Sequence, residues 1–250
     1  MQYSIPIPPK GADDKPLDVA AVMSLGRLTF SDNVNSCNKT LFPLGIPLLQ
    51  ARGAFWHQSL ESAMQRLLDE GHEFILTLDH DSWFMRGHLE RMILEMLDNP
   101  QIDALVPWQM KRGPGHTPLF TMPPDASGPR TSALLSEFQM PLTRIGTGHF
   151  GLTLIRASAL ADLPHPWFCP TPDPRGRWET GHTDADISFW RKFAAFGHQA
   201  FLSNGTMIGQ CELVVAFCGG PEYEYKKIWV SIEDAEAGKI PPCCIPKRKD

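Results

Sequence analysis

The chain has 250 residues, of which 42% are hydrophobic and 20% charged, and its formal net charge is −5. This composition is typical of a globular protein with a sizeable core and excludes a disordered chain. The negative charge gives no overall basic surface for nucleic acid, although an average hides local patches. No run approaches the ~20 apolar residues of a membrane-spanning helix. Six cysteines without a regular framework, and a first segment unlike a signal peptide, predict a cytoplasmic protein with reduced thiols.

Apolar runs alternate with helical patterns through residue 108. The predicted elements in this part are an extended proline-rich arm (1–16), a strand (17–25), a loop-rich insertion (29–44), a strand (46–50), a helix (56–68), a strand (73–78), a helix (85–96) and a strand (104–108). The first helix is identified by Leu60, Met64, Leu67 and Leu68, and Gly71 ends it. Strands that alternate with helices predict an α/β fold with a central, mostly parallel sheet flanked by helices.

The second half of the chain begins with a long segment of Gly, Pro and polar residues without periodicity, which predicts a functional loop. The elements expected after it are a glycine-interrupted apolar run (143–156), a short helix (157–163), an amphipathic helix (183–196), two strands (199–203 and 206–215), a closing helix (223–237) and a loose basic tail (241–250). We expect residues 17–240 to form one domain.

An acidic cluster follows the most apolar strand of the chain. The run at residues 74–78 has no alternation, which predicts a strand buried on both faces, and it stops at Asp79-His80-Asp81. Ligands of open α/β sheets gather beyond the carboxyl ends of the strands. Two carboxylates at such a place suit Mg²⁺ or Mn²⁺ that carries substrate phosphates. The simpler alternative is an Asp-rich turn that caps the next helix.

A second acidic cluster, Asp184 and Asp186, stands at the start of the helix predicted at residues 183–196. Aspartate is favoured there as a cap and by the helix dipole, so capping alone explains one of the two residues.

The order of five motifs resembles that of the GT-A glycosyltransferases of the family-2 type. These motifs are the D-x-D at Asp79, G-T-G-x-x-G-L-x-L-I-R from Gly146, P-W-F from Pro166, D-x-D-I-x-F-W from Asp184 and G-H-x-A-F from Gly197. The resemblance covers roughly residues 19–212. It implies a Rossmann-like nucleotide-diphospho-sugar transferase domain, in which residues 17–110 bind the nucleotide-sugar and residues 111–240 the acceptor.

The resemblance also implies a reaction: transfer of a sugar from a nucleotide-diphosphate sugar, with a UDP-sugar preferred, to an acceptor hydroxyl with inversion. Asp81 then becomes the main ligand of Mn²⁺ or Mg²⁺, and Asp79 lies near the ribose or diphosphate and the metal. The family's metal-binding histidine falls on Gln210, so His182 and His149 are alternative ligands. The family's catalytic aspartate falls on Asp186, with Asp184 as the second candidate. The other residues predicted to bind the nucleotide-sugar are Ser24, Gly26, Arg27, Arg52, His80, Gly146 and Gly148.

Two other functions stay open at this point. A nucleotidyltransferase would carry a glycine-rich basic loop after the first strand, where only Gly26-Arg27 stands. A non-catalytic nucleotide- or carbohydrate-binding module is suggested by Ala185, which replaces the family's first acidic residue, and by Gln210. The acceptor can be a saccharide, a protein, a small molecule or a modified nucleic acid.

Overall fold

The computed structural model describes residues 17–26, 29–112, 117–124, 135–218, 224 and 227–240, so the expected arm and tail lie outside the described residues. A seven-stranded sheet with the order β2-β1-β3-β7-β5-β8-β6 forms the centre. Its strands are β1 (Val19–Leu25), β2 (Leu48–Arg52), β3 (Phe74–Asp79), β5 (Ala104–Trp108), β6 (Leu142–Ile145), β7 (Leu152–Arg156) and β8 (Ala200–Met207). Only β6 and β7 run against the common direction of the sheet. The prediction of a mostly parallel α/β sheet is confirmed.

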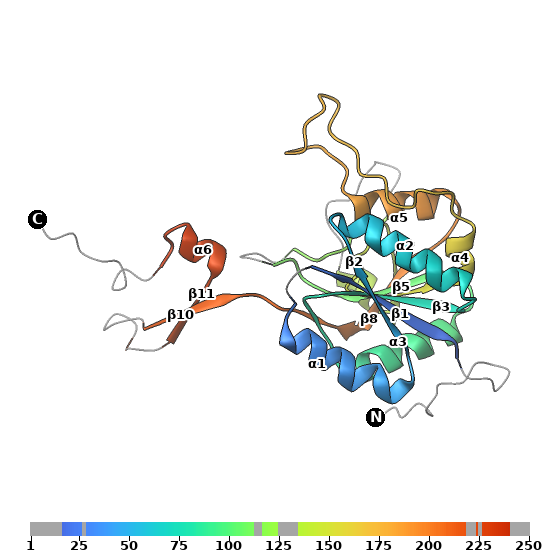
Figure 1. Ribbon diagram of the computed structural model, residues 1–250, viewed down its shortest axis with the longest axis horizontal. Helices are drawn as coiled ribbons and strands as arrows, with labels where there is room; N and C mark the ends of the chain where they lie inside the picture. The colour runs from blue at the N-terminus through green and yellow to red at the C-terminus, as the bar shows by residue number, and fades with distance from the viewer. Residues whose placement is uncertain are drawn as a thin grey trace, which may run out of the picture.

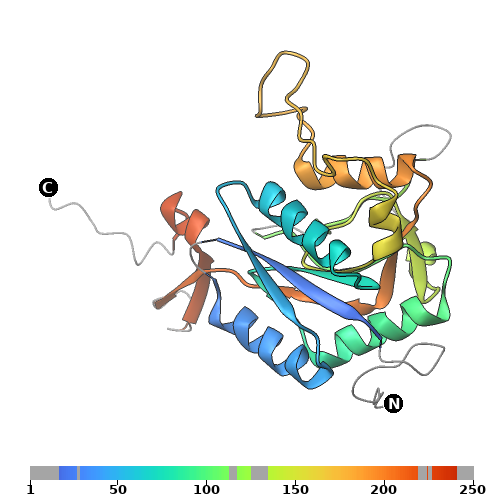
Figure 2. The ribbon, with the colours of Figure 1, turned by 45° about the vertical axis from the view of Figure 1, so that its right-hand side comes forward.

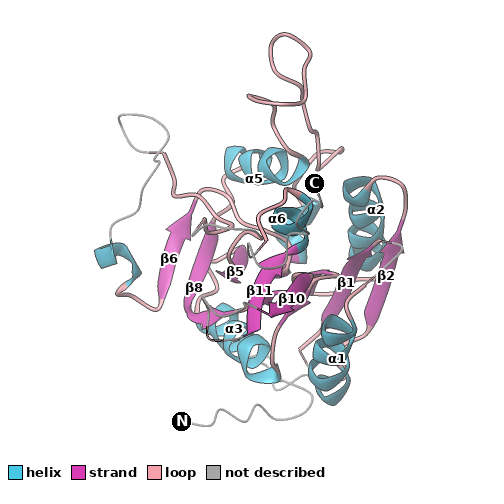
Figure 3. Ribbon diagram, turned by 90° about the vertical axis from the view of Figure 1, so that its left-hand side faces the viewer, coloured by secondary structure: helices cyan, strands magenta, loops and turns pink. Residues whose placement is uncertain are grey.

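Helices cover both faces of this sheet, as Figures 1 and 3 show. The helices are α1 (Ser31–Thr40), α2 (Trp56–Asp69), α3 (Arg86–Asp98), α4 (Ala157–Ala161) and α5 (Ala185–Ala195), with short 3₁₀ turns η1 (Phe42–Leu44) and η2 (Leu135–Phe138). One core cluster joins α2, α4 and α5 to one face, and the other joins α1 and α3 to the opposite face. Because side chains alternate along a strand, β1 and β3 feed both clusters, which explains their continuous apolar runs.

The predicted loop-rich insertion at residues 29–44 is wrong, because the segment forms α1 and η1. The helix had no apolar periodicity to reveal it, since its buried positions are largely polar and include Asn33, Ser36 and Thr40. Two of these side chains contact backbone groups: Asn33 Nδ2 donates to two carbonyl oxygens, and Ser36 Oγ accepts a hydrogen bond from the backbone N–H of Phe84.

The last part of the chain also differs from the prediction. The described residues of the expected closing helix at 223–237 include a strand, β11 (Lys227–Ser231), followed by the short helix α6 (Ile232–Glu236). Strand β11 pairs with β10 (Val214–Cys218), and this unit lies beside the body of the domain (Figures 1 and 2). A β-strand there is consistent with the β-branched and aromatic residues of KIWVS. None of the helices in the described part of the chain could cross a membrane.

Candidate functional site

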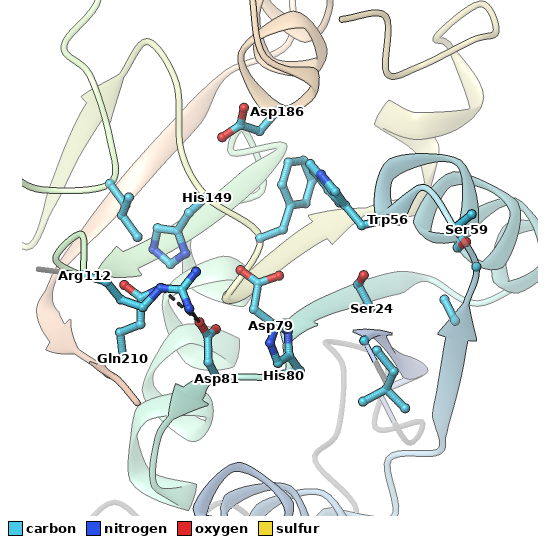
Figure 4. A pocket seen from close by; sticks show the side chains of 17 residues that line it. Ser24, Trp56, Ser59, Asp79, His80, Asp81, Arg112, His149, Asp186 and Gln210 are labelled. Carbon is cyan, nitrogen blue, oxygen red and sulfur yellow. Dashed lines mark hydrogen bonds and ion pairs between the residues drawn. The ribbon is translucent and has the colours of Figure 1, made fainter. Parts of the chain in front are cut away.

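A cavity of about 470 Å³ opens at the carboxyl ends of β1 and β3 (Figure 4). The strand ends contribute Ser24 and Asp79, which are partners in the parallel register of β1 and β3. Other elements complete the wall with His80, Asp81, Trp56, Ser59, Arg112, His149, Phe150, Asp186 and Gln210. The cavity therefore lies at the edge of the sheet where ligands of open α/β folds gather.

Helix α1 holds the acidic loop at this edge. The Asn33 side chain donates hydrogen bonds to the backbone oxygens of Asp79 (2.9 Å) and Ser82 (2.7 Å). Thr29 Oγ1 donates to the backbone oxygen of His80 at 3.0 Å. The polar helix that the sequence did not reveal thus fixes the backbone that carries Asp79 and Asp81, two of the predicted metal ligands.

Asp81 is 3% exposed and has two polar neighbours in the cavity. Gln210 Nε2 donates to Asp81 Oδ2 at 3.2 Å, and Arg112 Nη1 lies 3.5 Å from the same oxygen (Figure 4). Gln210 reaches this place because the short strands β4 (Ser82–Trp83) and β9 (Gly209–Gln210) pair antiparallel. The structure therefore brings together Asp81 and Gln210, which are 129 residues apart.

The carboxylate of Asp79 shares the cavity with those of Asp81 and Asp186. Burial, and then the negative charges of Asp81 and Asp186, raise the pKa of Asp79 to about 7, against an opposing effect of Arg112. Such mutual repulsion is relieved when a cation binds. Asp79 and Asp81, with the buried Oε1 of Gln210, which has no hydrogen-bond partner among the described residues, are suited to hold Mg²⁺ or Mn²⁺. No group of three or more His, Cys, Asp or Glu side chains in the described residues could hold a metal, so phosphate oxygens and water would supply the other ligands.

The two catalytic candidates lie in different places. Asp186 lines the cavity, and burial raises the pKa of its carboxyl group although the backbone N–H of Ile187 donates to Oδ1 at 2.8 Å. Asp184 precedes α5, its side chain is 67% exposed, and it accepts a hydrogen bond from His182 Nε2 at 2.8 Å. It does not line the cavity and makes no side-chain cap to the helix.

Neither histidine that was an alternative metal ligand is placed to serve as one. His149 Nε2 donates to the backbone oxygen of Pro107 at 2.9 Å, and Nδ1 accepts from Gly151 N at 3.0 Å, so both ring nitrogens are engaged. Burial lowers the pKa of His149 to about 4, which keeps the ring neutral. His182 lines a different cavity, away from Asp81.

The residues predicted to bind the nucleotide-sugar are also divided. Ser24, Gly26, Asp79 and His80 line the cavity, whereas Arg27 lies outside the described residues. Arg52 lines a neighbouring groove that shares Ala51 and Ser59 with the cavity.

Gly146 and Gly148 do not line this cavity. Close packing explains both glycines, since a Cβ would lie 2.8 Å from the backbone oxygen of Met122 at Gly146 and 2.7 Å from Val106 Cγ2 at Gly148. At these distances something must shift to admit a side chain.

Three residues that shape the cavity were not predicted from the sequence. Arg112 follows strand β5, and the only signal was a basic pair, Lys111-Arg112, at the start of the predicted loop. Trp56 and Phe150 form an aromatic wall, with ring centroids 6.3 Å apart. Helical periodicity shows which face of α2 is buried, but not that Trp56, its first residue, meets a ring from another loop.

No protein-family model and no curated protein matches the sequence, whereas solved structures match the fold. The structure of GalNAc-T7 with UDP, GalNAc and Mn²⁺ matches with a TM-score of 0.54 and 12% identity, over 78% of this chain and 44% of that one. A protein from STIV matches with a TM-score of 0.48 and 13% identity, over 84% and 92% of the two chains. Mannosyltransferase PcManGT from Pyrobaculum calidifontis, in complex with GDP-Man and Mn²⁺, matches with a TM-score of 0.46 and 11% identity, over 90% of this chain and 62% of that one.

The chain therefore has the fold of the GT-A glycosyltransferases, and this prediction is confirmed. It spans less than half the length of the GalNAc-T7 chain. At such low identity the likeness defines the fold alone, and the chemistry has to come from the site.

Proposed function

We propose that the protein is a metal-dependent glycosyltransferase that moves a sugar from a UDP-sugar to an acceptor hydroxyl with inversion. The observation that carries the proposal is the convergence of Asp79, Asp81 and Asp186 on one cavity at the strand ends of a GT-A fold. The presence of UDP and Mn²⁺ in the GalNAc-T7 structure supports the choice of donor and metal.

In this proposal Asp81 and Asp79 hold the cation with the amide oxygen of Gln210. When bound, Mn²⁺ or Mg²⁺ stabilises the charge of the departing diphosphate as a Lewis acid. Arg112 supplies a second positive charge beside Asp81, in a planar form that suits phosphate oxygens. Ser24 and Gly26, at the end of β1, face the ribose and base.

Asp186 accepts the proton of the attacking hydroxyl. Its position in the cavity and its raised pKa, which brings the carboxylate nearer to the working pH, both favour this role over Asp184. Attack on the anomeric carbon from the face opposite the diphosphate inverts that centre.

The test begins with a donor screen by thermal shift, with and without Mn²⁺, because a nucleotide-sugar that binds the native state raises the melting temperature. Turnover of the best donor is then measured as UDP release for Asp186→Asn and for the matched control Asp184→Asn. We expect Asp186→Asn to lower turnover at least ~10²-fold with nearly unchanged donor affinity, and Asp184→Asn to retain turnover. If only Asp184→Asn loses turnover, Asp184 is the catalytic base. If both variants retain turnover, neither carboxylate on this helix acts as the base.

A second candidate is a non-catalytic nucleotide- or carbohydrate-binding module. It is favoured by Gln210, a neutral side chain hydrogen-bonded to Asp81, and by Arg112, which already offsets the charge of that carboxylate. Metal-dependent binding of a UDP-sugar without release of UDP in the presence of an acceptor panel would identify the module rather than the enzyme.

A further inference from the structure

A second cavity, of about 740 Å³, lies between α5 and the edge of the sheet at β6 and β8. One face of α5 forms its wall with Ile187, Trp190, Arg191 and Ala194, which recur at helical spacing. No residue lines both this cavity and the one that contains Asp79 and Asp81. The second cavity is therefore a separate site.

The indole N–H of Trp190 indicates that the ligand of this cavity accepts a hydrogen bond. The residue is 1% exposed and lines the second cavity, and its indole Nε1 has no hydrogen-bond partner among the described residues. An indole N–H can only donate, and buried donors without a partner are rare in native proteins. His182 Nδ1, in the same wall, is also buried without a partner, while its Nε2 donates to Asp184.

The charge of the second cavity indicates that the ligand is an anion. Arg144 of β6 and Arg191 of α5 both line it, and neither forms an ion pair with a carboxylate of the described residues. Arg191 donates from Nη1 to the hydroxyl of Thr183 at 3.3 Å. His198, also in the wall, lies 3.7 Å from Asp103 and 3.8 Å from Asp162. Arg144 and Arg191 therefore give the cavity positive charge that no described carboxylate neutralises, although the net charge of the chain is −5.

The larger apolar side chains of the wall are those of Met122, Ile145, Ile187 and Phe193, and Thr121, Thr147 and Gln199 add polar groups beside them. We infer that this cavity binds a small organic anion, in which an apolar or aromatic body carries a phosphate or carboxylate group. The apolar body contacts the four apolar side chains, Arg144 and Arg191 neutralise the anion, and an acceptor atom of the ligand pairs with the Trp190 indole. The inference does not depend on the glycosyltransferase reaction.

Calorimetric titration of the full chain with phenyl phosphate, benzoate and inorganic phosphate tests the site. We expect one or both aromatic anions to bind, and to bind at least ~tenfold more tightly than inorganic phosphate, because inorganic phosphate lacks the apolar body. The stronger of phenyl phosphate and benzoate identifies the anionic group. The absence of binding by both, or equal affinity for inorganic phosphate, would overturn the inference.

Charge-matched variants locate the binding. Arg144→Gln and Arg191→Gln should each lower the affinity for the aromatic anion about tenfold, because each removes a charge-assisted contact. Arg175→Gln, on an exposed loop outside both cavities, is the matched control and should bind as the wild type does. Wild-type affinity in both arginine variants would refute the placement.

The Trp190 indole gives a separate readout. The chain has seven tryptophans, so indole N–H signals of ¹⁵N-labelled protein can be followed one by one, and Trp190→Phe assigns the relevant signal. Bound anion should move the Trp190 signal downfield through the new hydrogen bond. An unmoved Trp190 signal at saturating anion would contradict the proposed contact. Trp190 is a core residue, so if Trp190→Phe does not fold, the arginine titrations decide the matter.

Discussion

Asp79 is the residue where removal of a charge should stabilise the protein. Its carboxylate shares a cavity with Asp81 and Asp186, and its pKa is raised from 3.8 to about 7, first by burial and then by those two charges. Asp79→Asn keeps the shape of the side chain and removes the repulsion. We expect the metal-free variant to be more stable than the wild type at pH 8, and the advantage to shrink at pH 5.

The size of the effect follows from proton linkage. A native pKa above the unfolded value means that the native state binds more protons, so the unfolding free energy falls as pH rises from about 4 to about 7 and then levels off. If the native pKa of Asp79 is shifted fully to about 7, the unfolding free energy falls by roughly 2.6 kcal/mol between pH 5 and pH 8. Asp79 is partly exposed, which reduces the effect, so we expect about 1–2 kcal/mol, or about 2–8 °C in Tm for a chain of this size.

The assay is thermal unfolding of the wild type and Asp79→Asn in EDTA from pH 5 to pH 8, with the difference in Tm as the measured quantity. This difference removes the contribution of groups that titrate alike in both proteins. Added Mn²⁺ at pH 8 should raise the Tm of the wild type more than that of the variant, because the cation stabilises the ionised carboxylates. A difference in Tm that stays constant between pH 5 and pH 8 would refute the reasoning.

Three other changes have defined outcomes. Asp81→Ala should abolish Mn²⁺-dependent binding of a UDP-sugar while thermal unfolding stays cooperative, and calorimetry with unchanged affinity would remove Asp81 from the metal site. Gly146→Ala should lower stability by about 1–3 kcal/mol in denaturant titrations, because the new Cβ lies 2.8 Å from the backbone oxygen of Met122, and donor affinity should not change. Glu61→Ala should lower the free energy of unfolding by about 2–4 kcal/mol, because the Glu61 carboxylate accepts hydrogen bonds from the backbone N–H groups of Trp167 (2.8 Å) and Phe168 (3.2 Å). A decrease in the free energy of unfolding of less than ~1 kcal/mol would contradict this role.

The centre of the fold follows from local patterns in the sequence. The apolar run before Asp79 became β3, in the interior of the sheet, because a strand covered on both faces needs apolar side chains in both directions. The helical spacing of Leu60 and Met64 likewise marked the buried face of α2. Local periodicity is enough in these cases, since each burial pattern is repeated within a single element.

The tertiary structure decided what surrounds the acidic loop. Helix α1 carries a polar buried face, so hydrophobic periodicity could not reveal it, and its Asn33 acts on backbone atoms about fifty residues away. The family resemblance ranked Asp186 above Asp184, but helical geometry alone does not separate them. The turn at the start of α5 places the Asp186 side chain in the cavity and leaves that of Asp184 at the surface. Sequence spacing fixes neither the direction of a helix start nor the partner of a long side chain. The family resemblance already placed Gln210 with Asp81, whereas the contact of Arg112 with Asp81 came only from the packing of distant segments at one edge of the sheet.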